Sequence, residues 1–381
     1  MAGFRNDRSS IPFGRGQAAA LALAGVLGAS WMGGTAKGVQ KFDSRTGVSP
    51  LVATHAAAAV TSGASWDLPN LDHPRVDHFV NMFSTSKRDE FSRFLGRSGR
   101  YIPMMQAKLE QRGMPQDLIY LAMIESGFNP KAYSPAAASG LWQFIAETGR
   151  RYGLDINRAV DERNDPEKAT DAALDYLSEL HDRFGSWYLA AAAYNSGENR
   201  VARIMREETG SERGNEESYY QISDRLPKET RDYVPLMIAA ARISKDPARY
   251  GFDKVEIEAP LAYEEIVADP ATPLPAIAEA AGVELADIKH LNPQLKLDRT
   301  RDDQRSIVRI PPGARTAFLV NWPKVREQKT LAVRKYKVRR GDSLLAIAQR
   351  YGVSVSALKE VNDLRGSRII AGKTIAIPEE G

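Results

Sequence analysis

The stretch LIYLAMIESGFNP, residues 118–130, decides the fold of the first half of the chain. An uncharged run from Leu118 to Ile124 precedes Glu125, and Gly127 follows it. Pro115 stands where a first helical position would be, so the stretch predicts a buried helix that Gly127 stops. A carboxyl group at the end of a buried helix is desolvated, and this raises its pKa.

Glu125 therefore has two interpretations. A carboxylic acid that keeps its proton near neutral pH can act as the general acid in the cleavage of a glycosidic bond. Alternatively, Glu125 only bonds to nearby backbone or to an arginine. Ser134, Gly140 and Gln143 follow in a loop that we expect to lead into a helix at Leu141. Small and amide residues of this kind suit a groove for a polar, uncharged ligand.

Helical periodicity continues on both sides of this stretch. One helix is expected to open at Asp165-Pro166 and end at Gly185, and another to begin at Ser186 and break at residues 195–197. No segment between residues 75 and 250 alternates with period two, so the region is predicted to be all-α. Its aromatic residues offer flat faces for sugar rings, although such residues are more often core. The aromatic candidates are Tyr133, Trp142, Phe144, Trp187, Tyr188 and Tyr194.

After Gly251 the chain contains an internal repeat. Residues 274–312 and 336–378 each show a short amphipathic helix, Gly-Val, a second helix, an Asn and a β-like run into Pro. The second copy also begins with a strand, Lys335–Val338, which gives it the order β-α-α-β. The predicted fold class is therefore α+β multidomain, an all-α domain followed by small modules.

Composition excludes several classes of protein. A length of 381 residues suggests two or three domains, and 43% hydrophobic with 26% charged residues fits neither a disordered nor a polytopic membrane protein. The absence of cysteine excludes disulfides, thiolate metal sites and cysteine nucleophiles. The five histidines show no metal-ligand spacing, so we expect no metal and no cofactor. The basic end after Leu331 could bind nucleic acid or an anionic surface, but a solvated face is the better interpretation.

The N-terminus indicates export. Three arginines precede an apolar core at residues 18–29, which is shorter than the ~20 residues of a spanning helix. Residues 1–36 are predicted to be a secretory signal, with an uncleaved membrane anchor as the alternative, and residues 37–74 a linker. The rest of the chain is expected in the periplasm or cell envelope, which argues against a nucleic-acid partner.

Several motifs resemble known families. Glu125–Pro130, Ser139–Phe144 and Ala193–Gly197 resemble the transglycosylase domain related to goose-type lysozyme. Residues 148–154, 161–163 and 226–235 resemble the membrane-bound lytic murein transglycosylase D group. The likeness covers residues 75–250 and implies a lysozyme-like catalytic domain. Ala122 and Ala146 depart from it, since this group often has Pro there.

The resemblance implies that one carboxyl group carries the reaction. Glu125 would protonate the β-1,4 oxygen between N-acetylmuramic acid and N-acetylglucosamine, then accept the proton of the muramic C6 hydroxyl as a 1,6-anhydro ring closes. Ordinary glycosidases use two carboxylates. Near the motifs we find only Glu147, Asp155, Asp161 and Glu162, and the last two fit better as partners of Arg163 or helix caps. The implied substrate-groove residues are Ser134, Gln143, Tyr194, Asn195 and Tyr233.

The repeat resembles a peptidoglycan-binding module. Its second copy, residues 334–379, resembles LysM and implies glycan binding by Gly341, Asp342, Ser343 and Asn362, although Ala371 stands where such modules usually have Pro. The first copy, residues 258–314, lacks the Gly-Asp-Ser turn; its fold is expected to be LysM-like, and its sugar binding is left open.

Three functions follow as hypotheses: a lytic transglycosylase, a hydrolytic muramidase that uses water as acceptor, and a non-catalytic wall-binding scaffold. In each of them the expected partner is the glycan strand of peptidoglycan. We expect a monomer that can associate with a membrane through its N-terminus.

Overall fold

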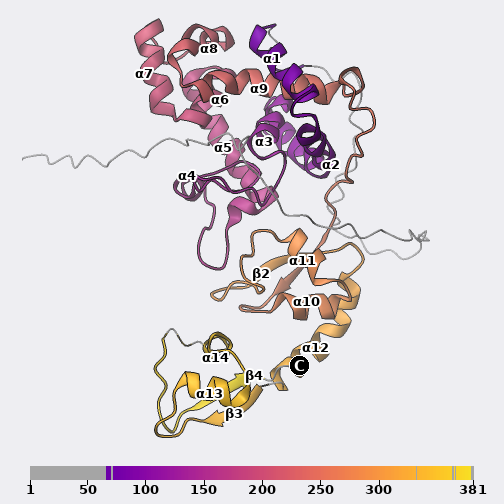
Figure 1. The fold of residues 1–381 in the computed structure, drawn as a ribbon, viewed down its shortest axis with the longest axis vertical. Helices are drawn as coiled ribbons and strands as arrows, with labels where there is room; N and C mark the ends of the chain where they lie inside the picture. Colours follow the sequence, from indigo (N-terminus) through magenta and orange to yellow (C-terminus); the bar gives the residue numbers. More distant parts are fainter. Residues whose placement is uncertain (1–65, 70–71, 332, 363, 365, 379–381) are drawn as a thin grey trace, which may run out of the picture. The chain divides into compact units, whose positions relative to one another are not determined.

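The structure is a computed structural model that describes residues 66–69, 72–331, 333–362, 364 and 366–378 (Figure 1). The predicted signal, residues 1–36, lies outside the described residues, as does most of the predicted linker. The chain forms two compact units. One runs up to Tyr263 and includes Asn292–Leu297; the other holds Glu264–Leu291 and the residues from Asp298 onward. In the described part, no helix is both long and apolar enough to cross a membrane.

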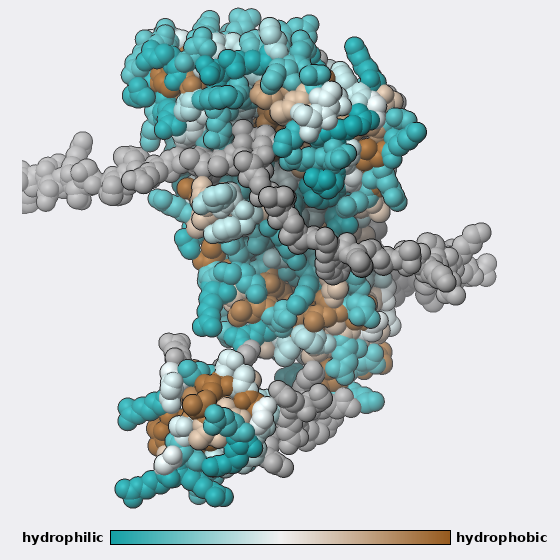
Figure 2. All heavy atoms as spheres, in the orientation of Figure 1, coloured by the Kyte–Doolittle hydropathy of each residue, from teal (hydrophilic) through white to brown (hydrophobic). Residues whose placement is uncertain are grey.

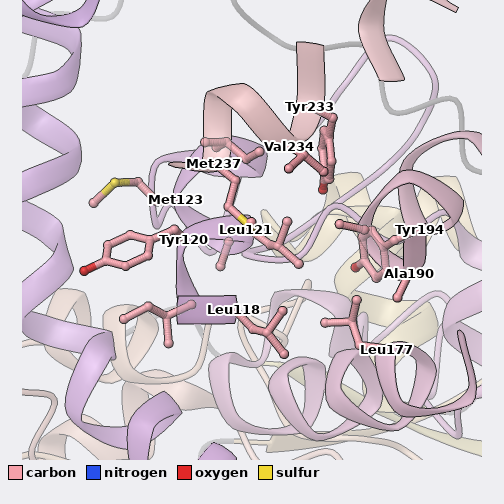
Figure 3. Packing of buried hydrophobic residues seen from close by; sticks show 14 of the residues in the cluster. Leu118, Tyr120, Leu121, Met123, Leu177, Ala190, Tyr194, Tyr233, Val234 and Met237 are labelled. Carbon is pink, nitrogen blue, oxygen red and sulfur yellow. The ribbon is translucent and has the colours of Figure 1, made fainter. Parts of the chain in front are cut away.

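The first unit is helical, as predicted. Its α-helices are α1 (Pro74–Ser84), α2 (Arg88–Gln111), α3 (Ile119–Ser126), α4 (Ala146–Arg151), α5 (Pro166–Phe184), α6 (Trp187–Ser196), α7 (Glu198–Thr209), α8 (Glu216–Ile222) and α9 (Lys228–Lys245). Helix α3 packs against α9 in the centre of the unit. Figure 3 shows the resulting apolar cluster, in which Leu121 of α3 lies with Val234 and Met237 of α9.

Local capping explains where these helices begin and end. The Asp165 side chain accepts from the amides of Glu167 and Lys168 and so starts α5, and Gly185 ends it in the left-handed conformation (φ 73°). Ser186 caps α6 in the same way, at 3.2 Å from the Leu189 amide. The predicted starts of α5 and α6 are confirmed.

The predicted helix at Leu141 is wrong. Residues 140–143 form a turn, and α4 begins only at Ala146. The Ser139 amide donates to the Phe144 carbonyl at 3.0 Å, and Gln143 has φ 48°. This backbone closes a tight loop in place of a helical turn, because a residue with positive φ does not continue a right-handed helix.

The second unit contains two β-α-α-β modules. The first consists of β1 (Glu264–Ala268), α10 (Leu274–Ala281), α11 (Leu285–Leu291) and β2 (Ser306–Ile310), and α12 (Arg315–Leu331) follows it. The second consists of β3 (Val333–Lys337), α13 (Leu344–Tyr351), α14 (Val355–Val361) and β4 (Thr374–Pro378). The two strands of each module pair antiparallel. The first copy thus also begins with a strand, although its sequence did not make this evident.

Each module has a small core and leaves apolar side chains at its surface. In the second module Ile347, Leu358 and Ile377 are buried between the helices and the strand pair. Figure 2 shows apolar atoms at the surface of this module, where Leu345 and Ile370 are exposed.

A short segment of the first module's sequence belongs to the helical unit. Within Asn292–Leu297, the Gln294 carbonyl accepts from the Asp161 amide at 2.9 Å, and the Lys296 amide donates to the Ala159 carbonyl at 2.9 Å. These two bonds flank an antiparallel bridge between Val160 and Leu295. The helical unit is therefore completed by residues that lie far along the chain.

Candidate active site

Glu125 lies in the last turn of α3, at the edge of the apolar core. Gly127 ends the helix in the left-handed conformation (φ 55°), and its amide donates to the Met123 carbonyl at 2.8 Å. A Cβ at Gly127 would lie 2.1 Å from the Phe94 ring, so no larger residue fits. The helix end is thus fixed, and the partly exposed Glu125 side chain is held beside the buried residues of α3.

The carboxyl group of Glu125 has an unusual protonation state. Burial raises its pKa to about 8. The Tyr233 hydroxyl donates to Glu125 Oε1 at 2.5 Å and opposes this shift, whereas the negative charge of Glu229 adds to it. At neutral pH the group therefore carries its proton, as the sequence predicts for a general acid. In the described chain its hydrogen-bond partner is a tyrosine and not an arginine.

Glu229 is a second carboxylate near Glu125, and the sequence analysis missed it. It lies in the first turn of α9, and its Oε1 accepts from Asn195 Nδ2 at 3.1 Å. The Thr230 hydroxyl donates to Asn195 Oδ1 at 2.8 Å, so both ends of the Asn195 amide are held by α9. The second carboxylates that the sequence suggested near the motifs were Glu147, Asp155, Asp161 and Glu162. The signal was present in the motif at residues 226–235, which contains Glu229.

Tyr194 and Tyr233 lie at the same edge of the apolar cluster (Figure 3). Both are almost fully buried, and the charge of Glu125 is one of the causes that raise the pKa of each phenol, after burial itself. The Tyr194 hydroxyl donates to the Trp142 carbonyl at 2.7 Å. The structure thus brings Tyr194, Tyr233 and Glu125 together, while contact with a sugar stays a prediction.

Ser134 and Gln143 both belong to the loop between α3 and α4, and their side chains are buried. The Ser134 hydroxyl accepts from the Ala138 amide at 3.1 Å, and Gln143 Nε2 donates to the Gly140 carbonyl at 2.9 Å. Their hydrogen bonds therefore hold the loop in shape. The predicted role of these two residues in substrate binding is not tested by these bonds.

Arg163 holds this loop in place through hydrogen bonds. Its guanidinium group donates to the Asp161 carboxylate through Nε (2.9 Å) and Nη2 (2.7 Å), and both side chains are buried. Its Nη1 donates to the Phe144 carbonyl at 2.9 Å. A Cβ at Gly140 would lie 1.7 Å from the Arg163 carbonyl oxygen, which requires glycine there. The interpretation of Asp161 as a structural partner of Arg163 is confirmed.

Most of the aromatic candidates are core. Trp142, Phe144, Tyr188 and Tyr194 are fully buried, and Trp187 stacks on His181 at 4.0 Å. Tyr133 differs, because 67% of its surface is exposed in the loop next to Ser134. Of these six residues it is the one whose side chain is largely exposed.

The predicted glycan-binding residues of the second module have partners within that module. Asp342 Oδ2 accepts from the Tyr336 hydroxyl and from the Arg339 amide, each at 2.7 Å. The Asn362 side chain exchanges two hydrogen bonds of 2.6 Å with the Ala376 backbone in β4. Ser343 caps α13, and Gly341 has φ 93°. Their contact with glycan stays a prediction. In the described residues, no cluster of His, Asp and Glu side chains could hold a metal ion.

Three protein families match the chain, in the order of its parts. The Transglycosylase SLT domain matches residues 103–216, which contain Glu125. The LysM-like domain of lytic transglycosylase MltD matches residues 262–326, and the LysM domain matches residues 336–378. The family matches fit the predicted order of a helical domain and two LysM-type modules.

Parts of the chain are also similar to individual proteins. Membrane-bound lytic murein transglycosylase D of Escherichia coli is 33% identical over 292 residues, which are 74% of this chain and 64% of that protein. Soluble lytic murein transglycosylase of Escherichia coli is 29% identical over 168 residues, 43% of this chain and 23% of that protein. The solved structure of SLT70 from Escherichia coli matches with 25% identity and a TM-score of 0.30, covering 48% of this chain and 27% of that one.

The match to membrane-bound lytic murein transglycosylase D thus spans slightly less than two thirds of that protein. Over that length the chain is similar to MltD: a helical, lysozyme-like region that matches the SLT domain is followed by two β-α-α-β modules of the LysM type.

Proposed function

We propose that the protein is a lytic transglycosylase of peptidoglycan. It cleaves the β-1,4 bond between N-acetylmuramic acid and N-acetylglucosamine and leaves a 1,6-anhydromuramic acid end. The observation that carries the proposal is the position of Glu125 beside the apolar core, where it is bonded to Tyr233 and burial raises its pKa to about 8. General-acid cleavage of a glycosidic bond needs a carboxylic acid that is still protonated at the working pH.

The proposed reaction uses Glu125 twice. Its proton passes to the glycosidic oxygen as the bond from that oxygen to C1 of muramic acid breaks. The substrate's own N-acetyl group stabilises the positive charge at C1. The Glu125 carboxylate then accepts the proton of the C6 hydroxyl, whose oxygen forms the new bond to C1. An internal hydroxyl held close to C1 reacts faster than water from bulk solution, because it loses little translational and rotational freedom on the way to the transition state.

Tyr233 has a defined part in this cycle. Its hydroxyl donates to Oε1 of Glu125, whose carboxyl group becomes charged after the first proton transfer. Hydrogen bonds to a carboxylate are stronger than bonds to the neutral acid, so Tyr233 favours the transfer of the proton to the substrate.

Glu229 gives a reason to keep a hydrolytic muramidase as the second candidate. In ordinary inverting glycosidases a second carboxylate activates water. Glu229 is close enough to raise the pKa of Glu125, but its Oε1 is already bonded to Asn195. A carboxylate with this fixed partner is better placed to add to the rise in the pKa of Glu125, which burial dominates, than to activate water.

The LysM-type modules supply the proposed affinity for the wall. Weak binding of glycan by the second module would raise the concentration of substrate around the tethered SLT domain. The proposed site of action is the cell envelope, with the N-terminus as signal or anchor.

Mass spectrometry of soluble products from purified sacculi tests the proposal, with the protein compared with its Glu125→Gln variant. Products lighter by one water than hydrolytic muropeptides, absent with the variant, are expected. Hydrated products would replace the proposal by a muramidase, and binding without turnover by a wall-binding scaffold. More than a tenth of the rate retained by Glu125→Gln would exclude Glu125 as the acid.

A further inference from the structure

A cavity of about 640 Å³ lies on the helical unit, and basic residues outnumber acidic ones in its lining. Arg88, Arg93 and Arg97 contribute from α2, and Lys254 contributes from the chain that follows α9. The acidic residues in the lining are Glu256 and Glu258. Neither the proposed reaction nor the predicted glycan-binding residues use this cavity.

The cavity exists because an extended segment lies directly on α2. The Glu258 amide donates to the Gly96 carbonyl at 2.8 Å, and the Leu261 amide donates to the Arg100 carbonyl at 3.0 Å. A Cβ at Gly99 would lie 2.2 Å from the Glu258 carbonyl oxygen, so only glycine permits this approach. Figure 1 shows this segment descending from α9 beside α2. The walls of the cavity are thus fixed by backbone contacts.

The two glutamates offset only part of the positive charge of the four basic residues in the lining. In the described part of the chain, neither Arg93 nor Lys254 forms an ion pair. Arg88 donates to backbone carbonyl oxygens, and Glu258 pairs with Arg100 at 2.9 Å. Burial lowers the pKa of the Arg97 guanidinium; Glu258 opposes this shift and the neighbouring charge of Arg93 adds to it. An anion in the cavity would relieve this repulsion.

Arg97 connects the cavity with the candidate active site. Its Nε donates to the Gly127 carbonyl at 2.7 Å, and Gly127 follows Glu125 by two residues. A ligand bound to the guanidinium group of Arg97 is therefore separated from the end of α3 only by the Arg97 side chain. Because the site lies so close to Glu125, we favour an anionic group of the substrate itself as its ligand.

We propose that this cavity binds carboxylate groups of the peptides that are attached to the glycan strand. The inference rests on the proposed function, because it takes peptidoglycan as the substrate. The sugars at the cleaved bond offer hydroxyl and amide groups, while the peptides supply carboxylates. Guanidinium groups match the planar carboxylate with paired hydrogen bonds, and Lys254 adds a point charge at the rim.

Calorimetric titration of the full chain tests the proposal with the tripeptide L-Ala-γ-D-Glu-meso-diaminopimelate as probe. The double variant Arg93→Gln/Lys254→Gln removes the two cations without an ion pair. The double variant Arg158→Gln/Arg200→Gln is the matched control, since it removes the same charge from two exposed residues outside the cavity. We expect the first double variant to bind the peptide at least tenfold more weakly. The control should change the affinity for the peptide less than twofold.

Three results would overturn the inference: equal affinity in both double variants, equal affinity for the peptide with amidated carboxylates, or tighter binding of inorganic phosphate than of the peptide. Tighter binding of phosphate would indicate a site for phosphate groups, such as those of lipid headgroups. The Glu125→Gln variant keeps the proposals separate, because it should bind the peptide normally. If sacculi yield no anhydro products while the peptide still binds, the proposed reaction fails and the anion site stands.

Discussion

The hydrogen bond from Tyr233 to Glu125 leads to a prediction about the pH dependence of the rate. In the proposed reaction Glu125 acts first as an acid, so kcat/KM should fall as the pH rises through its pKa of about 8. Tyr233 stabilises the charged form and lowers this pKa. The variant Tyr233→Phe therefore has a higher Glu125 pKa, and the alkaline limb of the profile moves to higher pH.

The size of the shift follows from the strength of the bond. A hydrogen bond to a charged group contributes roughly 1.5–3 kcal/mol, and one pKa unit corresponds to about 1.4 kcal/mol. The same hydroxyl also bonds to the neutral acid, so the upper end of this range is not reached. We expect the alkaline limb of the kcat/KM profile to move by about one pH unit. The rate below the limb should fall as well, since the carboxylate formed in the first step loses its donor.

The assay is the initial rate of release of soluble fragments from sacculi between pH 5 and 10. Glu229→Gln is the opposing variant: it removes a negative charge that raises the pKa of Glu125, so its limb should move to lower pH. Tyr219→Phe is the control, because that hydroxyl donates to the carbonyls of Thr230 and Arg231 and not to Glu125. An unchanged limb in Tyr233→Phe, or shifts of equal sign in the two variants, would refute the reasoning.

Three further predictions concern stability and binding. Glu125→Gln should raise Tm by several °C at pH 9 and hardly at pH 5, because the raised pKa of Glu125 costs stability as the pH rises from about 4.5 to 8; calorimetric scans at both pH values measure this. Gly140→Ala should cost more than about 2 kcal/mol in urea unfolding, since its Cβ would meet the Arg163 carbonyl at a φ of 86°; an unchanged midpoint would contradict the packing. Tyr133→Ala, at a largely exposed site, should leave Tm within about 1 °C and raise KM for sacculi several-fold, whereas an unchanged KM would exclude a sugar platform there.

The parts of the fold that the sequence predicted depend on local signals. The helix around residues 118–126, the starts at Asp165 and Ser186 and the β-α-α-β order of the second repeat come from periodicity and capping, which act over a few residues. The failed helix at Leu141 depends on the bonds between Ser139, Phe144 and Arg163. The contact of Arg163 with Phe144 joins residues 19 positions apart, and it leaves no pattern in a short window.

The candidate site shows the same division. Glu125 could be identified because its apolar flank is contiguous, and the family resemblance added Tyr233. Glu229 stands in the motif at residues 226–235, but its effect on Glu125 is not evident there, because that effect arises only when α9 packs against α3. The basic cavity is formed by α2 and the chain after α9, more than 150 residues apart, so its charges could not be grouped from the sequence.

The segment Asn292–Leu297 has a consequence for how such chains evolve. Duplication and loss of modules are easy when the break point falls in a linker and costs no backbone pairing. Here the first module's sequence supplies the partner of residues 159–161 in the helical unit, so a recombination event that removed this module would also leave Asp161 and Ala159 without their backbone partners. The first module is thus expected to be inherited together with the helical unit and to tolerate the decay of its own turn. In the described residues the second module supplies no backbone partner to the helical unit. It is therefore the copy that can be gained, lost or multiplied.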